Sequence, residues 1–269
     1  MANRRSLIGE VAVMTMSGSA EPIDINNYLT IVALEDGLTA QLSTNACEYC
    51  VDGNGNWKTL PADTNTETIN TGQTLSFRGN LTPISSGIGT FTISKSCNLE
   101  GNCMPMLFGD EAVGNNSLEG KDCAFIELFR NCTTIKSVSS GFLPATTLSE
   151  ECYGSMFYGC TNLTTAPELP ATTLVDSCYN YMFSGCTNLT TAPELPATTL
   201  VDYCYYYMFF GCSKLNYIKA MFTTRPSFTY TSNWVNGVAS KGTFVKNKNA
   251  TWNVTGVNGV PSGWTITTA

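Results

Sequence analysis

Apolar and polar positions repeat with a period of 26 residues in the second half of the chain. Residues 161–186 and 187–212 are identical at all but three positions, and residues 143–160 match the end of both copies. Degenerate copies flank the array, at residues 128–132 and 213–222. The apolar residues that recur at fixed phase are, in one copy, Leu163, Leu169, Leu174, Cys178, Met182, Phe183 and Cys186. A single copy cannot bury its apolar side alone, so the repetition predicts a solenoid of stacked coils with a continuous core.

Each copy predicts the same short elements. Residues 163–169 read as an extended segment that ends at Pro170. Asp176 is placed to cap a short helix over residues 178–183, and the next copy repeats this arrangement with Asp202. A Gly-Cys pair then turns the chain into the following coil.

Residues 28–110 show a different pattern, in which apolar and polar residues alternate over short runs. Gly, Asn and Asp residues separate these runs at intervals typical of a sandwich. The expected strands cover residues 28–34, 38–42, 47–51, 57–60, 66–69, 74–78 and 89–93. The pattern predicts a small antiparallel β-sandwich.

Two further segments are expected to close the array. Residues 97–122 connect the sandwich to the first coil and cap it. At the other end, residues 223–269 carry Trp234, Trp252 and Trp264, which suit a bulky aromatic cap over an open solenoid end. The elements expected in this cap are a helix start at 230–233, strands at 242–246 and 251–254, and a turn at 261–264.

Composition narrows the function. The 269 residues include no histidine, which excludes Ser–His–Asp and Cys–His nucleophile pairs and every histidine-containing metal site. The net charge of −7 argues against a nucleic-acid-binding surface. No apolar run reaches the roughly 18–20 residues of a membrane span. The carboxylates Glu168 and Glu194 recur with the coil, which is typical of a solvated ladder rather than of a glycosidase pair. We therefore expect no enzyme activity, no cofactor, no nucleic-acid partner and no membrane insertion.

Cysteines and one acidic loop are the candidate metal ligands. The cysteines of the repeat, such as Cys178 and Cys186, are expected to be buried and reduced, with disulfides or a metal site as the alternatives. Four further cysteines could in principle form a zinc site, although only the first pair has zinc-like spacing: Cys47, Cys50, Cys97 and Cys103. Residues 52–56 resemble the start of a calcium loop but lack its later Gly and Glu. We therefore expect no metal.

The repeat carries a family resemblance. Its pattern, CYxxMFxGCTNLTxAPELPATTL, resembles the BspA-type leucine-rich repeat, which is common in surface proteins of gut Bacteroidales and in proteins of the phages that infect them. The resemblance covers residues 123–222, where the period, the FxGC turn and the LPATTL segment occur together. It implies a leucine-rich-repeat solenoid and a structural or adhesion function.

The predicted fold is thus α+β and mainly β, with an N-terminal antiparallel β-sandwich, a short leucine-rich-repeat solenoid and a small C-terminal cap. The boundaries that we expect are an anchor segment at 1–27, the β-sandwich at 28–110, the solenoid of 26-residue period at 111–222 and the capping module at 223–269.

Differences between the copies point to a candidate ligand-binding face. They concentrate around the expected short helix and involve Tyr, Ser, Asn, Gly and Phe, which supply rigid aromatic area and adaptable hydrogen bonds in paratopes. Drift at exposed positions without any ligand would produce the same pattern. The candidate residues are Tyr153, Tyr158, Tyr179, Asn180, Tyr181, Tyr203, Tyr205, Tyr206, Tyr207 and Phe210.

The N-terminus separates two functional hypotheses. Arg4 and Arg5 precede an apolar run, but Glu10 interrupts it, so a signal peptide is not expected. A bacterial surface adhesin would carry an export signal, whereas a phage protein is released by lysis. The sequence therefore favours a phage virion component, a head or tail fibre or decoration protein that presents its solenoid to a host-surface protein or glycan. Residues 1–27 would bind other virion proteins, and a homo-oligomer is expected, with a trimer favoured. The alternative is a BspA-type adhesin or binding module at the bacterial cell surface.

Overall fold

The computed structural model describes residues 21–269 and is mainly β, with 22% of the chain in strands and 7% in helices. The predicted anchor at 1–27 lies largely outside the described residues. The strands are β1 (Leu29–Ala33), β2 (Ala40–Leu42), β3 (Cys47–Val51), β4 (Lys58–Leu60), β5 (Thr74–Arg78), β6 (Phe91–Ile93), β7 (Cys97–Gly101), β8 (Ile135–Val138), β9 (Tyr217–Ala220), β10 (Thr243–Lys246) and β11 (Thr265–Thr268). The α-helices are α1 (Pro105–Phe108) and α2 (Phe228–Thr231), and the 3-10 helices are η1 (Ile25–Asn27), η2 (Gly109–Ala112) and η3 (Ser140–Phe142).

The N-terminal part contains two sheets. The larger has the strand order β4-β3-β5-β1-β7-β8, and β2 pairs with β6 in the smaller. All these pairs are antiparallel except β7 with β8, which is parallel. The strands predicted at 47–51 and 74–78 are confirmed in full, and four others are confirmed with shorter bounds. The strand predicted at 66–69 is wrong, because the structure has only a single bridge between Leu38 and Ile69 there. Strand β7 lies in the segment that was expected to be a connection.

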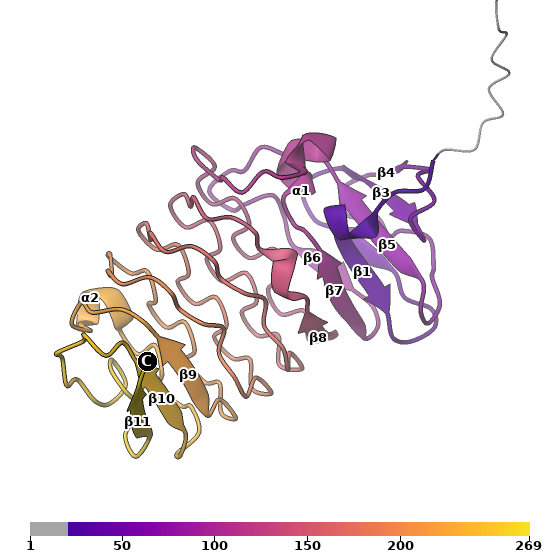
Figure 1. Ribbon diagram of the computed structural model, residues 1–269. Helices are drawn as coiled ribbons and strands as arrows, with labels where there is room; N and C mark the ends of the chain where they lie inside the picture. The colour runs from indigo at the N-terminus through magenta and orange to yellow at the C-terminus, as the bar shows by residue number, and fades with distance from the viewer. Residues whose placement is uncertain (1–20) are drawn as a thin grey trace, which may run out of the picture.

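From β8 onward the chain forms coils that lie side by side in one row (Figure 1). Backbone hydrogen bonds join equivalent regions of neighbouring coils in a strictly alternating way. The N–H of Tyr179 donates to the carbonyl of Cys204 at 3.2 Å, and the N–H of Tyr181 donates to the carbonyl of Tyr206 at 2.8 Å. The residue between them, Asn180, donates instead within its own coil, to Ser177 at 3.2 Å. Every second residue in this region thus bonds to the next coil, 25 residues ahead.

The short helix predicted over residues 178–183, with Asp176 or Asp202 as its cap, is wrong. Consecutive turns replace it, because the backbone changes hand every fourth residue: φ is +56° at Ser177, +54° at Tyr181 and +77° at Gly185. An α-helix needs an unbroken run of right-handed residues. Here the right-handed residues are interrupted, and the freed N–H groups bond to the neighbouring coil.

Columns of aromatic rings form the core of the stack. Phe129, Phe157, Phe183 and Phe209 lie one above another, with centroid distances of 5.6, 5.7 and 5.8 Å and interplanar angles of 4–6°. Phe91 of β6 extends this column on the N-terminal side, 5.5 Å from Phe129. The N-terminal sheets and the coils therefore share one core.

The alternating pattern continues into the C-terminal segment. The N–H groups of Tyr207 and Phe209 donate to the carbonyls of Ser232 and Trp234, at 2.9 and 2.8 Å. The three tryptophans expected to form a cap are buried, and β9, β10 and β11 form a parallel sheet. The predicted helix start at 230–233 is wrong, since α2 ends at Thr231 and Asn233 has a φ of +50°. The strand predicted at 251–254 is also wrong, while the strand at 242–246 and the turn at 261–264 are confirmed.

Candidate functional site

Six of the ten candidate residues form a cluster of rings on one side of the stack, which we call the aromatic face: Tyr158, Tyr181, Tyr203, Tyr206, Tyr207 and Phe210. Tyr181 stacks on Tyr207 of the next coil at 5.0 Å and meets the edge of Tyr206 at 5.4 Å. Tyr203 and Phe210 are the most exposed members, at 47% and 39% of their surface. The face spans three consecutive coils.

Four candidate residues do not belong to this face, which corrects the prediction. Tyr153, Tyr179 and Tyr205 are buried to 1% exposure and stack at 5.9 and 6.2 Å as a second core column. Their spacing of 26 residues and their apolar neighbours place them beside the phenylalanine column. Asn180 is half-buried, and its side-chain oxygen is buried above Gly154, where an added Cβ would lie 2.4 Å from it. None of these four residues can present its side chain to a ligand.

Three members of the aromatic face occupy an unfavourable backbone conformation. Tyr181, Tyr203 and Tyr207 have φ values of +54°, +53° and +52°. Bulky residues rarely adopt the left-handed region, because Cβ approaches the neighbouring carbonyl at a cost of about 1–2 kcal/mol. The column that contains Tyr181 and Tyr207 also has a left-handed residue in the flanking coils, where it is Ser155 or Asn233.

The tyrosines of the face remain protonated over the physiological range. Burial, reinforced by the neighbouring phenol of Tyr206, raises the pKa of Tyr181 to about 12. At one end of the face the Arg130 guanidinium lies 4.8 Å from the centre of the Tyr158 ring and pairs with Glu127. At the other end Asn233 donates a hydrogen bond from its amide to the Tyr207 hydroxyl at 2.9 Å.

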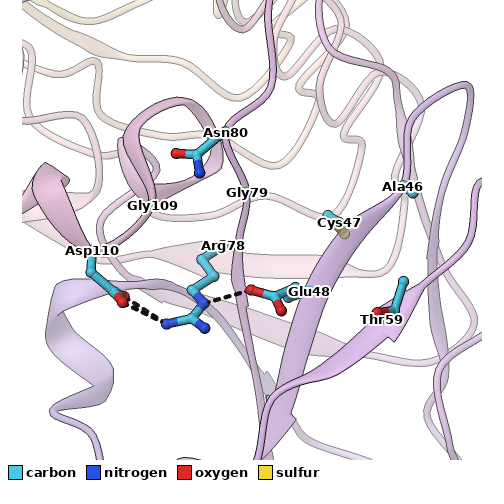
Figure 2. Close-up of a pocket in the computed structure, with 9 residues that line it drawn as sticks. All are labelled: Ala46, Cys47, Glu48, Thr59, Arg78, Gly79, Asn80, Gly109 and Asp110. Carbon is cyan, nitrogen blue, oxygen red and sulfur yellow. Dashed lines mark hydrogen bonds and ion pairs between the residues drawn. The ribbon is translucent and has the colours of Figure 1, made fainter.

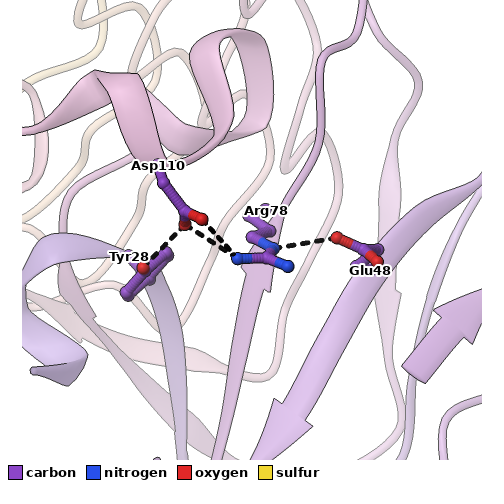
Figure 3. A network of polar contacts seen from close by, with 4 residues as sticks. All are labelled: Tyr28, Glu48, Arg78 and Asp110. Atoms are coloured by element: carbon purple, nitrogen blue, oxygen red, sulfur yellow. Dashed lines mark hydrogen bonds and ion pairs between the residues drawn. The ribbon is translucent and has the colours of Figure 1, made fainter. Parts of the chain in front are cut away.

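A second candidate site is a cleft of about 400 Å³ in the N-terminal part, between β3, β4, β5 and η2 (Figure 2). Arg78 lies at its centre and bonds to Glu48 through Nε at 2.8 Å. Its Nη1 bonds to both oxygens of Asp110 at 2.7 and 2.8 Å. The Tyr28 hydroxyl donates to Asp110 at 2.8 Å, which completes a four-residue network (Figure 3).

The network holds η2 against the large sheet, and this use accounts for its charges. Arg78 also lies 4.1 Å from the centre of the Trp57 ring, in cation–π contact. Burial would raise the pKa of Asp110, but the hydrogen bonds from Tyr28 and Arg78 outweigh burial and lower it. Because its polar groups bond to one another, the cleft presents fewer free groups to a ligand than its lining suggests. Sequence reasoning missed it, since its residues come from four separate segments.

The structure has all twelve cysteines as free thiols. Cys132, Cys160, Cys186 and Cys212 each place their sulfur 2.8–3.2 Å from a carbonyl of the phenylalanine column. Burial raises the pKa of Cys47, Cys97 and Cys132 to about 12. Between residues 21 and 269 no group of three or more Cys, Asp or Glu side chains could hold a metal ion. Asp52, in the calcium-like loop, accepts hydrogen bonds from the backbone of Thr74 and the side chain of Gln73.

Comparison with known proteins gives no relative: no family model, no curated protein and no solved structure matches this chain. A search for long apolar helices over the described part of the chain also finds none that could cross a membrane.

Proposed function

We propose that the protein is a non-enzymatic adhesion protein whose aromatic face binds a ligand on a host-cell surface. Its fold, in this proposal, is an N-terminal β-sandwich followed by a leucine-rich-repeat solenoid of the BspA type and a C-terminal cap. The observation that carries the function is the aromatic face itself, with Tyr203 and Phe210 exposed at 47% and 39%. Exposed tyrosines offer large contact area at low cost in side-chain entropy.

Backbone strain supports a ligand-binding role over random drift. Tyr181, Tyr203 and Tyr207 pay for a left-handed conformation that Gly or Asn would adopt freely. Strained residues concentrate at functional sites, where another requirement keeps them in place. Contact with a ligand through the phenol rings is such a requirement.

The scaffold beneath the face supports binding through pre-organisation. The N–H groups of Tyr181 and Tyr207 are fixed to the next coil at 2.8 and 2.9 Å. The column of phenylalanine rings packs directly behind them. A rigid surface loses little conformational entropy when it binds, so a modest number of ring contacts is enough for useful affinity.

For its place in the cell, the proposal is a phage virion component, either a fibre or a decoration protein. It rests on the resemblance of residues 123–222 to repeats found in such proteins. Binding to other virion proteins through the N-terminal segment and assembly as a homotrimer are part of it. The alternative, an adhesin of the bacterial surface, uses the same aromatic face. Light scattering of the full chain and of a chain lacking residues 1–27 tests the assembly role, which predicts an oligomer that the truncation abolishes.

Binding to intact Bacteroidales cells tests the function. The triple variant Tyr181→Asn, Tyr203→Asn and Tyr207→Asn should lose binding of the labelled protein. A matched control, Ile84→Asn with Val113→Asn, removes two exposed apolar side chains from the N-terminal half and should bind as the original chain does. Equal binding by the triple variant and the original chain would refute a role for the aromatic face.

A further inference from the structure

We infer that the ligand of the aromatic face is an extended, arginine- or lysine-rich segment of a partner protein. This inference rests on the proposed function, because it names the partner of the same face. A row of carboxylates beside the face, an aromatic surface without its own cations in the later coils, and one internal example of the same contact carry it.

The row of carboxylates contains one acidic residue per coil: Asp122, Glu150, Asp176 and Asp202. All four are exposed. The carbonyls of Glu150, Asp176 and Asp202 each accept a hydrogen bond from the preceding coil, at 2.9, 3.2 and 3.0 Å, so the residues occupy equivalent places in neighbouring coils. Among residues 21–269, none of these four carboxylates is in an ion pair.

Such a row is costly for the protein by itself. Like charges at equivalent positions of neighbouring strands repel one another, and each coil adds one more to the same line. The overall charge of −7 increases the negative potential. A line of unpaired carboxylates attracts cations and raises their local concentration.

The acidic row borders the aromatic face. Asp202 precedes Tyr203 in the chain, and the Tyr203 ring meets that of Tyr206 at 5.5 Å. A cation held near Asp202 therefore also has exposed phenol rings within reach. An aromatic ring and a carboxylate together favour a guanidinium or ammonium group, which can stack on the ring and pair with the charge.

The first coil already contains this contact within the protein. Arg130 stacks over Tyr158 at 4.8 Å and pairs with Glu127. In the later coils, the position of Arg130 is taken by Tyr158, Ser184 and Phe210, none of which is cationic. The face thus supplies rings and carboxylates beyond the first coil but no cation, and the partner must bring it.

The shape of the surface indicates an extended segment. The acidic row and the rings run along the axis of the stack over several coils, so a linear partner can engage more than one of them at once. An anionic glycan would be repelled by the acidic row. A basic protein segment fits both the charge and the rings.

The test uses the full chain and a fluorescent peptide of alternating Arg and Ser, followed by anisotropy. Binding should weaken several-fold as salt rises, because exposed charges are screened. The double variant Asp176→Asn, Asp202→Asn should weaken binding about tenfold. The control Glu168→Gln, Glu194→Gln makes the same change in net charge on other exposed carboxylates of the same coils and should leave binding within twofold.

Three outcomes would overturn the inference: no binding of the peptide, an equal loss in the control variant, or a preference for a cationic amino-sugar oligomer over the peptide. The cell-binding assay separates this failure from failure of the proposed function. If the tyrosine variant loses cell binding while the peptide does not bind, the face is an adhesion surface for another ligand. If neither assay depends on the tyrosines, both proposals fall.

Discussion

Tyr207 and Asn233 occupy equivalent positions in consecutive coils, and the Asn233 amide donates a hydrogen bond to the Tyr207 hydroxyl at 2.9 Å. Their φ values, +52° and +50°, are nearly the same. The same backbone shape therefore accepts asparagine, which tolerates the left-handed region, as well as tyrosine, which does not. This equivalence shows which residue suits the backbone and which one must be there for another reason.

Replacing Tyr181 by asparagine should change stability little. Relief of the left-handed backbone gains about 1–2 kcal/mol, and the lost ring contacts cost a similar amount. The free energy of unfolding should therefore stay within about 1 kcal/mol of the original, as measured by denaturant titration. Cell binding should fall in the same variant. A loss of stability as large as that of a core substitution would contradict the idea that strain is stored at the face.

Tyr179, two residues earlier, should respond in the opposite way. Its hydroxyl is buried and has no hydrogen-bond partner among the described residues, and the first coil has Phe125 in this column. Tyr179→Phe should raise the free energy of unfolding by about 1 kcal/mol, because an unsatisfied buried polar group is removed. Tyr179→Ala should lower it by about 3–5 kcal/mol by opening a cavity. Thermal unfolding of both variants checks the pair, and a destabilised Tyr179→Phe would show that the hydroxyl is bonded.

The thiols should be unreactive in the native protein. Burial raises the pKa of Cys160, Cys178 and Cys186 well above the usual value, so almost no thiolate is present at pH 8. Only Cys123 is half-buried, and burial together with Glu151 raises its pKa as well. A colorimetric thiol reagent should label at most this one residue, slowly, and all twelve cysteines after unfolding. Cys123→Ser should abolish the native signal, and rapid labelling of several thiols would count against the packed core.

Acid should loosen the contact between η2 and the large sheet. The pKa of Asp110 is lowered in the folded protein, so its carboxylate contributes stability that is fully present above its unfolded pKa of about 4. This contribution is lost as the pH falls through the lower, folded pKa. The stability difference between the original chain and Asp110→Asn should therefore be constant above about pH 5 and shrink below pH 4. Unfolding titrations at several pH values test this, and a difference that is independent of pH would exclude the ion pair as its source.

The sequence predicted the repeating part of the fold better than its local conformation. The 26-residue period and its inward apolar residues lie where the coils stack. The helix over 178–183 was wrong because helical turns and alternating turns both place apolar residues on one side. Gly185 gave a sign of left-handed backbone, whereas Ser177 and Tyr181 adopt it without any sign in their residue type.

The aromatic face was only partly predictable, for the same reason. Tyr179 and Tyr181 differ by two positions, and only the alternation of the turns sends one into the core and the other outward. The variable positions were informative: Tyr203, Tyr206 and Phe210 differ from the preceding copy, and all three belong to the face. The network of Tyr28, Arg78 and Asp110 was not predictable, since 82 residues separate two of its members.

The phenylalanine column has a consequence for how this protein can evolve. Phe157, Phe183 and Phe209 meet their neighbours through nearly identical contacts, so one coil can replace another at the same interface. Residues 161–186 and 187–212 are almost identical, which makes the corresponding gene segments partners for unequal recombination. Such an exchange would remove or insert one whole coil and leave the reading frame intact. The reach of the aromatic face could thus lengthen or shorten in single steps while both ends of the molecule stay unchanged.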